Sequence, residues 1–312
     1  MAHTALSAGR YDIFGLRRLR LAIAPWHALL ALAVVIVWSL NFVVAKEGLR
    51  ELPPLLLIAL RFLLVGIILL PFAQRPKSWR PILTMSATLG VLHFAFMFIA
   101  MDRAVNIASL GVVAQLNAPF SVLLAAVFWH DRLGIWRTLG VSLAFAGVIF
   151  MSFDPIVLGQ IDAVILCAIS ALFWAVANVS SKHENMPDPM TLNCWMGFCT
   201  FPPMLLLSFL MESGQGEALL NAGWRGWGAV VYMSVMVTAF GYGIWFYLIR
   251  TYSVSLITPF ILLVVPTVAF FTVTLLGDAL SWRMVVGGLC TVIGVGVVIL
   301  RRPHLAKQPT RG

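Results

Sequence analysis

The chain has 312 residues, of which 61% are hydrophobic and 11% charged, and its mean hydropathy is +0.96. These values exclude an ordinary soluble domain, in which about a quarter of the residues are charged. The net charge of +9 does not indicate a nucleic-acid partner, because the basic residues cluster at the ends of apolar segments instead of forming one patch.

Apolar segments follow one another along almost the whole chain. A helix needs roughly 20 apolar residues to cross a bilayer, and segments of this length must be helical because lipid offers no partner to backbone groups. The first segment follows Arg17, Arg18 and Arg20 but is too long for a signal peptide, so we expect it to remain as a span. The sequence therefore predicts an all-α integral membrane protein with ten transmembrane helices, near residues 27–46, 54–73, 82–101, 106–129, 134–152, 160–181, 190–211, 227–248, 255–276 and 282–301.

The distribution of lysine and arginine predicts the orientation. With the N-terminus inside, the inner segments hold fifteen of these residues and the outer segments five, while Arg61 lies within a span. Cytoplasmic loops carry the excess of basic residues. We therefore expect both tails, residues 1–26 and 302–312, to be cytoplasmic and the number of spans to be even.

One pattern occurs twice in the chain. Trp38 and Lys46 recur 136 positions later as Trp174 and Lys182, and a longer set recurs 147 positions later: Arg103, Pro119, Asp131, Leu133, Gly140 and Gly147 match Arg250, Pro266, Asp278, Leu280, Gly287 and Gly294. We predict two five-helix repeats, residues 27–152 and 160–301. An odd number of spans inverts the second copy, and inverted repeats are the architecture of many secondary transporters.

Pro119 and Pro266 lie in the middle of spans four and nine, where a proline removes a backbone hydrogen bond and kinks the helix. The kinks could widen a central site that rocks between two states, or they could be static packing features. Their recurrence at equivalent positions favours the first interpretation.

Polar side chains inside spans need a reason, since each is costly in lipid. Asn41, His93, Gln115, Asn117 and Asn178 are of this kind. Each could join helices through a hydrogen bond or line a binding site. Gln115 and Asn117 immediately precede Pro119 in span four. His93 could be a satisfied structural residue, a ligand or a proton carrier.

Four aromatic residues lie deeper than the interfacial belt: Trp38, Trp174, Tyr242 and Trp245. Core packing and a cavity wall are both compatible with them. The glycines on either side of Tyr242 would permit a close helix approach. Since the two equivalent tryptophans should approach one axis from opposite sides, we expect a site near the bilayer midplane, where they and the two prolines come together.

Two basic residues are anomalous. Arg61 lies about seven residues into span two, where it either extends towards the outer surface or meets a carboxylate of a substrate. Lys46, at the outer end of span one, could play either part.

The sequence contains no phosphate-binding G-x-x-x-x-G-K-[ST] motif and no histidine or carboxylate spacing typical of a metal site, so we expect neither a cofactor nor a metal. Nor does a carboxylate lie well inside a span. Proton coupling would therefore need His93 or an acid at a span end; otherwise transport would be facilitated or driven by exchange.

Several stretches resemble the EamA-type carriers of the drug/metabolite transporter superfamily. They are W-S-L-N-F-V-V-A-K at 38–46 with P-P at 53–54 and R-F at 61–62, and A-Q-L-N-A-P-F-S-V-L-L-A-A-V-F-W-H-D-R-L at 114–133. The family usually ends this second stretch G-E-R-L, where His130 and Asp131 stand here, and the second copy ends G-D-A-L at 277–280. G-Y-G-I-W at 241–245 is similar to the family's exporters of O-acetylserine and cysteine.

The resemblance implies a cavity between two halves, alternating access and export across the inner membrane. It places Trp38, Asn41, Gln115, Asn117, Trp174 and Tyr242 around that cavity. We expect the partners to be the lipid bilayer and a small solute, with protons as one candidate coupling ion; the oligomeric state stays open. Amino acids or their derivatives are the favoured solutes, because Asn41 replaces the carboxylate with which small multidrug carriers hold a cation. A multidrug or purine exporter is the alternative, and an integral-membrane enzyme a distant one.

Overall fold

The computed structural model describes residues 23–129, 134–180, 186–252 and 257–300, and every regular element in these ranges is a helix. Within these ranges, ten helices are long and apolar enough to cross a membrane. The predicted fold class is thereby confirmed, and the limits of the spans differ from the predicted ones by at most four residues. Most of the two predicted tails, together with Asp131, Leu133 and Lys182, lies outside the described residues.

Apart from the tenth, five spans are single helices or a helix with one extra turn: α1 (Pro25–Gly48), α2 (Pro54–Leu69) with η2 (Leu70–Phe72), α7 (Ile135–Ser152), α9 (Ile161–Ser180) and α10 (Pro189–Met211). The third span joins α3 (Trp79–Met85), η3 (Ser86–His93) and α4 (Phe94–Arg103), and the fourth joins α5 (Ile107–Val113), η4 (Ala114–Leu116) and α6 (Asn117–Trp129). The eighth joins α12 (Trp224–Tyr232), η5 (Met233–Tyr242) and α13 (Gly243–Thr251), the ninth joins η6 (Thr258–Leu263), α15 (Val264–Phe271) and η7 (Thr272–Leu276), and the tenth is α16 (Trp282–Leu300). Two short helices, α8 (Pro155–Leu158) and α11 (Gln215–Asn221), lie in connections.

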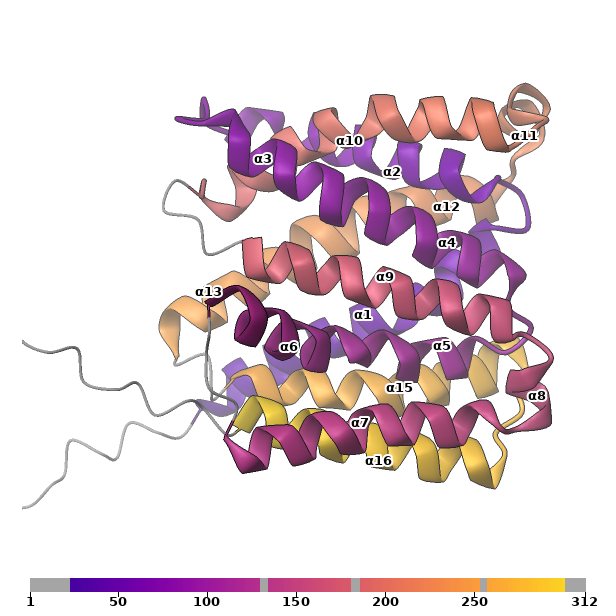
Figure 1. The fold of residues 1–312 in the computed structure, drawn as a ribbon. Coiled ribbons are helices and arrows are strands. Elements are labelled where there is room, and N and C mark those ends of the chain that lie inside the picture. The colour runs from indigo at the N-terminus through magenta and orange to yellow at the C-terminus, as the bar shows by residue number, and fades with distance from the viewer. Residues whose placement is uncertain (1–22, 130–133, 181–185, 253–256, 301–312) are drawn as a thin grey trace, which may run out of the picture.

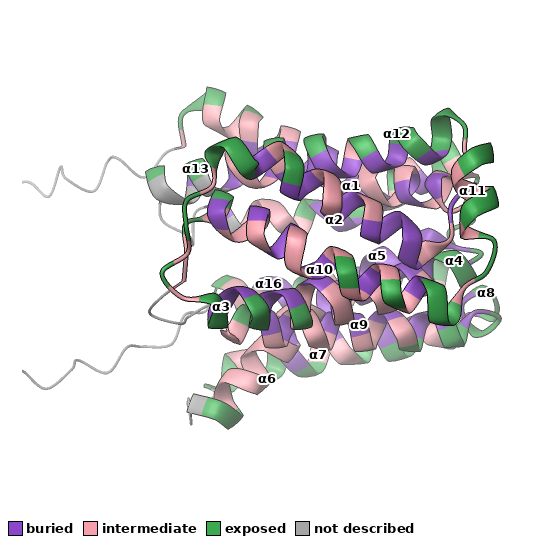
Figure 2. Ribbon diagram, turned by 90° about the horizontal axis from the view of Figure 1, so that it is seen from above, coloured by how far each residue is buried: buried purple, intermediate pink, exposed green. Residues whose placement is uncertain are grey.

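The spans run side by side in one bundle (Figure 1). The pair α7 and α16 forms one flank, and α2, α3 and α10 form the opposite flank. The described chain begins and ends at the same end of the bundle, which we call the terminal end; the opposite end, where α1 and α4 finish, is the distal end. Most helices carry both buried and exposed residues along their length (Figure 2). Many of these exposed side chains are large and apolar, as a surface in contact with lipid requires.

The contacts between spans follow a twofold pattern. α2 packs along α10, and α7 packs along α16, so each of these pairs joins a span with its own counterpart in the other half. The contact of α9 with η3 and α4 is matched by that of α1 with α12 and η5, and the contact of α9 with α5 and α6 is matched by that of α1 with α15. This is the arrangement that two inverted copies produce.

The repeated glycines lie where α7 and α16 touch. A Cβ atom on Gly147 would lie 2.5 Å from the carbonyl oxygen of Gly287, and one on Gly287 would lie 2.5 Å from that of Gly147. Gly140 and Gly294 approach each other in the same reciprocal way, at 2.8 and 2.6 Å. Small residues let membrane helices approach until their backbones touch, which explains why the G-x6-G spacing occurs in both copies.

Some helix irregularities also occur in pairs. The π-helical segments η3 and η5 occupy equivalent places in the third and eighth spans, and the 3₁₀ segments η4 and η6 precede Pro119 and Pro266. Each proline leaves the carbonyl of the residue four positions earlier without its helical donor, and that residue lies in the 3₁₀ segment: Gln115 in η4 and Leu262 in η6.

Candidate functional site

A cavity of about 360 Å³ lies among spans of both halves. This volume is within the range of small-molecule sites, roughly 300–1,000 Å³. The described residues that line it include Arg61 and all nine residues for which the sequence suggested substrate binding: Trp38, Asn41, His93, Gln115, Asn117, Trp174, Asn178, Tyr242 and Trp245.

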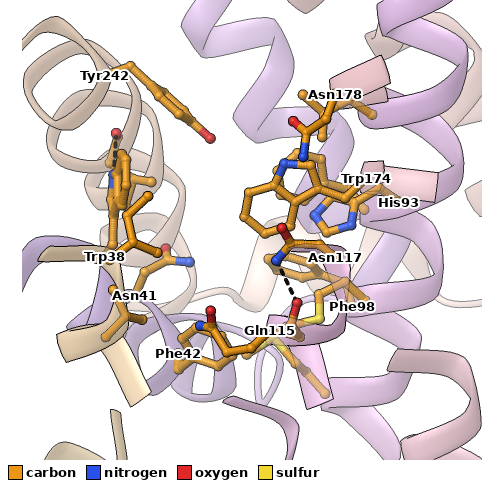
Figure 3. A pocket seen from close by; sticks show the side chains of 18 of the residues that line it. Trp38, Asn41, Phe42, His93, Phe98, Gln115, Asn117, Trp174, Asn178 and Tyr242 are labelled. Atoms are coloured by element: carbon orange, nitrogen blue, oxygen red, sulfur yellow. Dashed lines mark hydrogen bonds between the residues drawn. The ribbon is translucent and has the colours of Figure 1, made fainter. Parts of the chain in front are cut away.

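The cavity has two walls (Figure 3). Trp38, Asn41 and Tyr242 form one wall and come from α1 and η5. His93 and Trp174 belong to the other wall and come from η3 and α9. Because α1 corresponds to α9 and η5 to η3, the walls are equivalent parts of the two copies.

The first wall is held by an aromatic cluster around Trp38. Its ring centroid lies 5.3 Å from those of both Tyr242 and Trp245, and its Nε1 donates a hydrogen bond to the carbonyl of Val237 in the π-helical segment, at 3.4 Å. A Cβ atom at Gly241 would lie 2.6 Å from this Nε1. The glycine beside Tyr242 therefore permits the close approach that the sequence suggested.

The second wall is organised by His93. Its Nδ1 lies 2.7 Å from the hydroxyl oxygen and 3.1 Å from the carbonyl oxygen of Ser170, and its ring packs between Phe94 and Trp174, with centroids 4.6 and 4.9 Å away. This histidine thus has a structural role in addition to its place on the cavity surface.

The amide side chains of the cavity differ in their hydrogen bonding. Asn117 donates to the carbonyl of Ala114 at 2.7 Å, which ties it to its own helix, and Asn178 donates to the hydroxyl of Ser121 at 3.4 Å. The Oδ1 atom of Asn41 is buried and has no hydrogen-bond partner among the described residues. This acceptor therefore has hydrogen-bonding capacity that the described fold does not satisfy.

Arg61 is 3% exposed and therefore does not extend to the outer surface. Its carbonyl accepts a hydrogen bond from Ser234, but its Nε and Nη1 atoms are buried without a partner in the described part of the chain. The guanidinium carbon lies 4.5 Å from the ring centroid of Phe94 and 5.7 Å from that of Phe62. None of the described residues that line the cavity is acidic.

Lys46 does not line the cavity. Its Nζ donates to the carbonyls of Met101 and Ala104 at 2.8 Å and of Asp102 at 3.0 Å, which are the last carbonyls of α4 and its connection. A cation at a helix C-terminus is stabilised by the helix dipole. This residue therefore fixes the distal ends of two spans to each other.

Neither proline lines the cavity. Pro266 borders an apolar crevice between α15 and α16, and Pro119 follows two lining residues, Gln115 and Asn117, in the sequence. Trp38 and Trp174 thus line one cavity from opposite walls, whereas the two prolines do not line it.

The described lining residues that sequence reasoning missed are all apolar: Phe42, Leu89, Phe94, Met97, Phe98, Met101, Ala114, Val237, Ile261 and Val264. In a sequence this apolar, such residues look the same as lipid-facing or core positions. In the ranges that the structure describes, no group of three or more metal-ligating side chains occurs.

Three comparisons with known proteins bear on this site. The model of the EamA-like transporter family matches residues 25–153 and 162–300. The chain is 32% identical over 276 residues to a "Probable amino-acid metabolite efflux pump" of Salmonella typhimurium, covering 85% of this chain and 92% of that protein. It is also 32% identical over 259 residues to a protein of the same description from Escherichia coli, covering 80% and 86%.

Two more distant matches agree with these. An "Uncharacterized transporter YoaV" of Bacillus subtilis is 22% identical over 277 residues, covering 85% of this chain and 93% of that protein. A solved structure described as "Crystal structure of protein" superposes with a TM-score of 0.58 at 20% identity and covers 88% of this chain and 96% of its own. At that identity the likeness concerns the fold alone.

Proposed function

Because the chain belongs to the EamA-like transporter family, we propose that it is a secondary carrier that exports small metabolites, with amino acids or their derivatives as the solutes. One observation carries this proposal: among the described residues, a cavity with equivalent walls from two inverted copies is lined by amide side chains, aromatic rings and one guanidinium. Polar groups at this depth are costly unless they serve a solute or a neighbouring helix. The printed names of two relatives at 32% identity support amino-acid metabolites as the class of solute.

The mechanism we propose is alternating access, in which the two walls move against each other. At the distal end they are joined by the bonds of Lys46 from α1 to α4, and by the bond between Asp278 and the N–H of Ala108 at 2.8 Å. The side chain of Asn106 adds a bond to the carbonyl of Ala279, also at 2.8 Å. In this state the distal end is held closed, and opening it would require these bonds to break.

We further propose that the carrier lies in the inner membrane with its terminal end in the cytoplasm. The excess of lysine and arginine in the connections at that end supports this orientation. The described state is then the one in which the outer end is closed.

Flux in reconstituted liposomes tests the function. A panel of amino acids, purines and cationic drugs should show protein-dependent flux for amino acids. Asn41→Ala and Gln115→Ala should each lower that flux about 2- to 10-fold, the worth of one hydrogen bond. Asn193→Ala is the matched control, because this asparagine lies in a span but donates to Pro189 of its own helix at 2.8 Å and does not line the cavity. Absence of flux for the whole panel would reject the proposal, and unchanged flux in both cavity variants would remove these amides from the site.

A further inference from the structure

We propose that Arg61 is the receptor for the carboxylate of the solute, and that the solutes are zwitterions with a single carboxylate. This inference rests on the proposed function, since it names the chemistry by which the same cavity selects its cargo. It assigns to Arg61 direct contact with the solute instead of a role in packing.

The hydrogen bonding of Arg61 carries the argument. A buried charge is tolerated when it is paired and hydrogen-bonded, and it is strongly unfavourable when it is not. Nε and Nη1 of Arg61 are buried without an acceptor among the described residues. The two phenylalanine rings beside the guanidinium offer a cation–π contact, but their carbons do not replace the acceptors that the N–H groups need.

The charges around the cavity indicate where the missing acceptor comes from. The three ion pairs of the described chain, Arg50–Glu47, Arg103–Asp162 and Arg225–Glu47, all lie at the distal end. No carboxylate belongs to the described lining of the cavity. A ligand anion is therefore the partner that can complete the guanidinium, and the planar fork of arginine matches a carboxylate with two parallel hydrogen bonds.

The rest of the lining complements a cation and an apolar body. The unpartnered Oδ1 of Asn41 can accept a hydrogen bond from an ammonium group. Trp38, Trp174 and Trp245 line the same space, and the face of an indole ring attracts an ammonium group as well. No second lysine or arginine is among the described lining residues, so a second carboxylate on the solute would remain unpaired. This combination fits an amino acid whose side chain is uncharged.

Thermal unfolding of the purified protein in detergent tests the proposal with L-alanine, L-leucine, L-methionine and L-phenylalanine, each beside its carboxamide. In the wild type at least one acid should bind about 10- to 100-fold more tightly than its amide, the worth of a hydrogen bond to a charged group. Arg61→Gln should reduce this ratio to near one, and Arg61→Lys should retain part of it. Arg80→Gln, which removes an exposed arginine at the start of α3, is the matched control and should keep the full ratio.

The midpoint temperature of unfolding without ligand distinguishes a binding role of Arg61 from a packing role, because the two roles predict opposite changes in Arg61→Gln. If Arg61 awaits a ligand, Arg61→Gln removes an unpaired buried charge and should raise the midpoint temperature. If Arg61 only holds Phe62 and Phe94 together, the same change should lower it. A lowered midpoint with an unchanged acid-to-amide ratio would overturn the proposal, as would stabilisation by chloride equal to that by the amino acids, or no stabilisation by any of the four.

Flux separates this proposal from the proposed function. Amino-acid flux that keeps its acid-to-amide preference in Arg61→Gln would reject the role of Arg61 and leave the carrier function standing. Acid-selective binding that depends on Arg61 without flux of any solute would reject the carrier function and support the site.

Discussion

The distal end and the central cavity differ in whether the fold supplies hydrogen-bond acceptors to a basic side chain. At the distal end, Lys46 donates to three backbone carbonyls and also lies near Asp102 and Asp278. In the cavity, Arg61 is almost fully buried and has no acceptor for Nε or Nη1 among the described residues. Both residues lie within spans, yet only the lysine is satisfied by the fold. The difference indicates that the lysine maintains the structure and that the arginine awaits a partner from outside the chain.

The acidic residues of the distal end, like Lys46, form hydrogen bonds with backbone groups at the ends of helices. Glu212 accepts from the first N–H groups of α2, Glu51 from those of Gly223 and Gly226 at the start of α12, and Asp278 from that of Ala108 in α5. Carboxylates at helix N-termini and a cation at a C-terminus are each favoured by the helix dipole. Charge at this end is thus used to finish helices, whereas in the cavity two N–H groups of the Arg61 guanidinium find no acceptor among the described residues.

The largest effect is expected from Lys46→Met, which removes three charge-assisted hydrogen bonds and leaves the carbonyls at the end of α4 without their donor. The free energy of unfolding should fall by about 1.5–3 kcal/mol, measured by thermal or chemical unfolding in detergent. Lys46→Arg should recover most of the loss, since it keeps the cation. If Lys46→Met left the stability unchanged and Arg61→Gln lowered it, the arginine and not the lysine would be the residue that maintains the structure.

A smaller effect is expected from Glu212→Gln. The carboxylate accepts hydrogen bonds from Leu55 and Leu56 at 2.7 and 3.2 Å and from the hydroxyl of Ser208 at 2.6 Å. The amide keeps one acceptor and loses the charge at the start of α2, so stability should fall by about 0.5–2 kcal/mol. The control is Glu217→Gln, an exposed acid in α11. Equal effects of the two substitutions would show that capping of α2 contributes nothing.

The fold was predictable because its determinants are local or periodic. The length of the apolar segments gives the spans, and the repeated residues give the relation between the halves. The glycines of the repeat, such as Gly147 and Gly287, were visible as a spacing, but their reciprocal contact follows only from the packing of α7 on α16.

The cavity was predictable only in its polar and aromatic members. Asn41, Gln115 and Trp174 stand out in an apolar sequence, whereas Phe94 and Met97 do not, although they line the same space. Whether a side chain has a hydrogen-bond partner is a tertiary property, so the sequence could not distinguish Lys46 from Arg61. The repeat predicts where the site lies through Trp38 and Trp174, but not its polar groups, because its offset pairs Gln115 and Asn117 with the apolar Leu262 and Val264.

The smallest effect concerns the pH dependence of Asp278, at the distal end beyond the ninth span. Burial raises the pKa of this carboxyl above its usual value, although hydrogen bonds from Ala108 and Thr272 and the charge of Lys46 act in the other direction. A carboxyl whose pKa is higher in the folded state binds its proton more tightly when folded, so stability falls as pH rises from about 4, the unfolded value, through the folded pKa.

Asp278→Asn removes this titration and keeps an acceptor for the N–H of Ala108. The midpoint temperature of the wild type minus that of the variant should therefore decrease as pH rises through this window and then stay constant. A difference that increases with pH would show that the contacts of the ionised carboxylate outweigh its burial. In that case Asp278 would be as well satisfied as Lys46, and the contrast between the distal end and Arg61 would be sharper still.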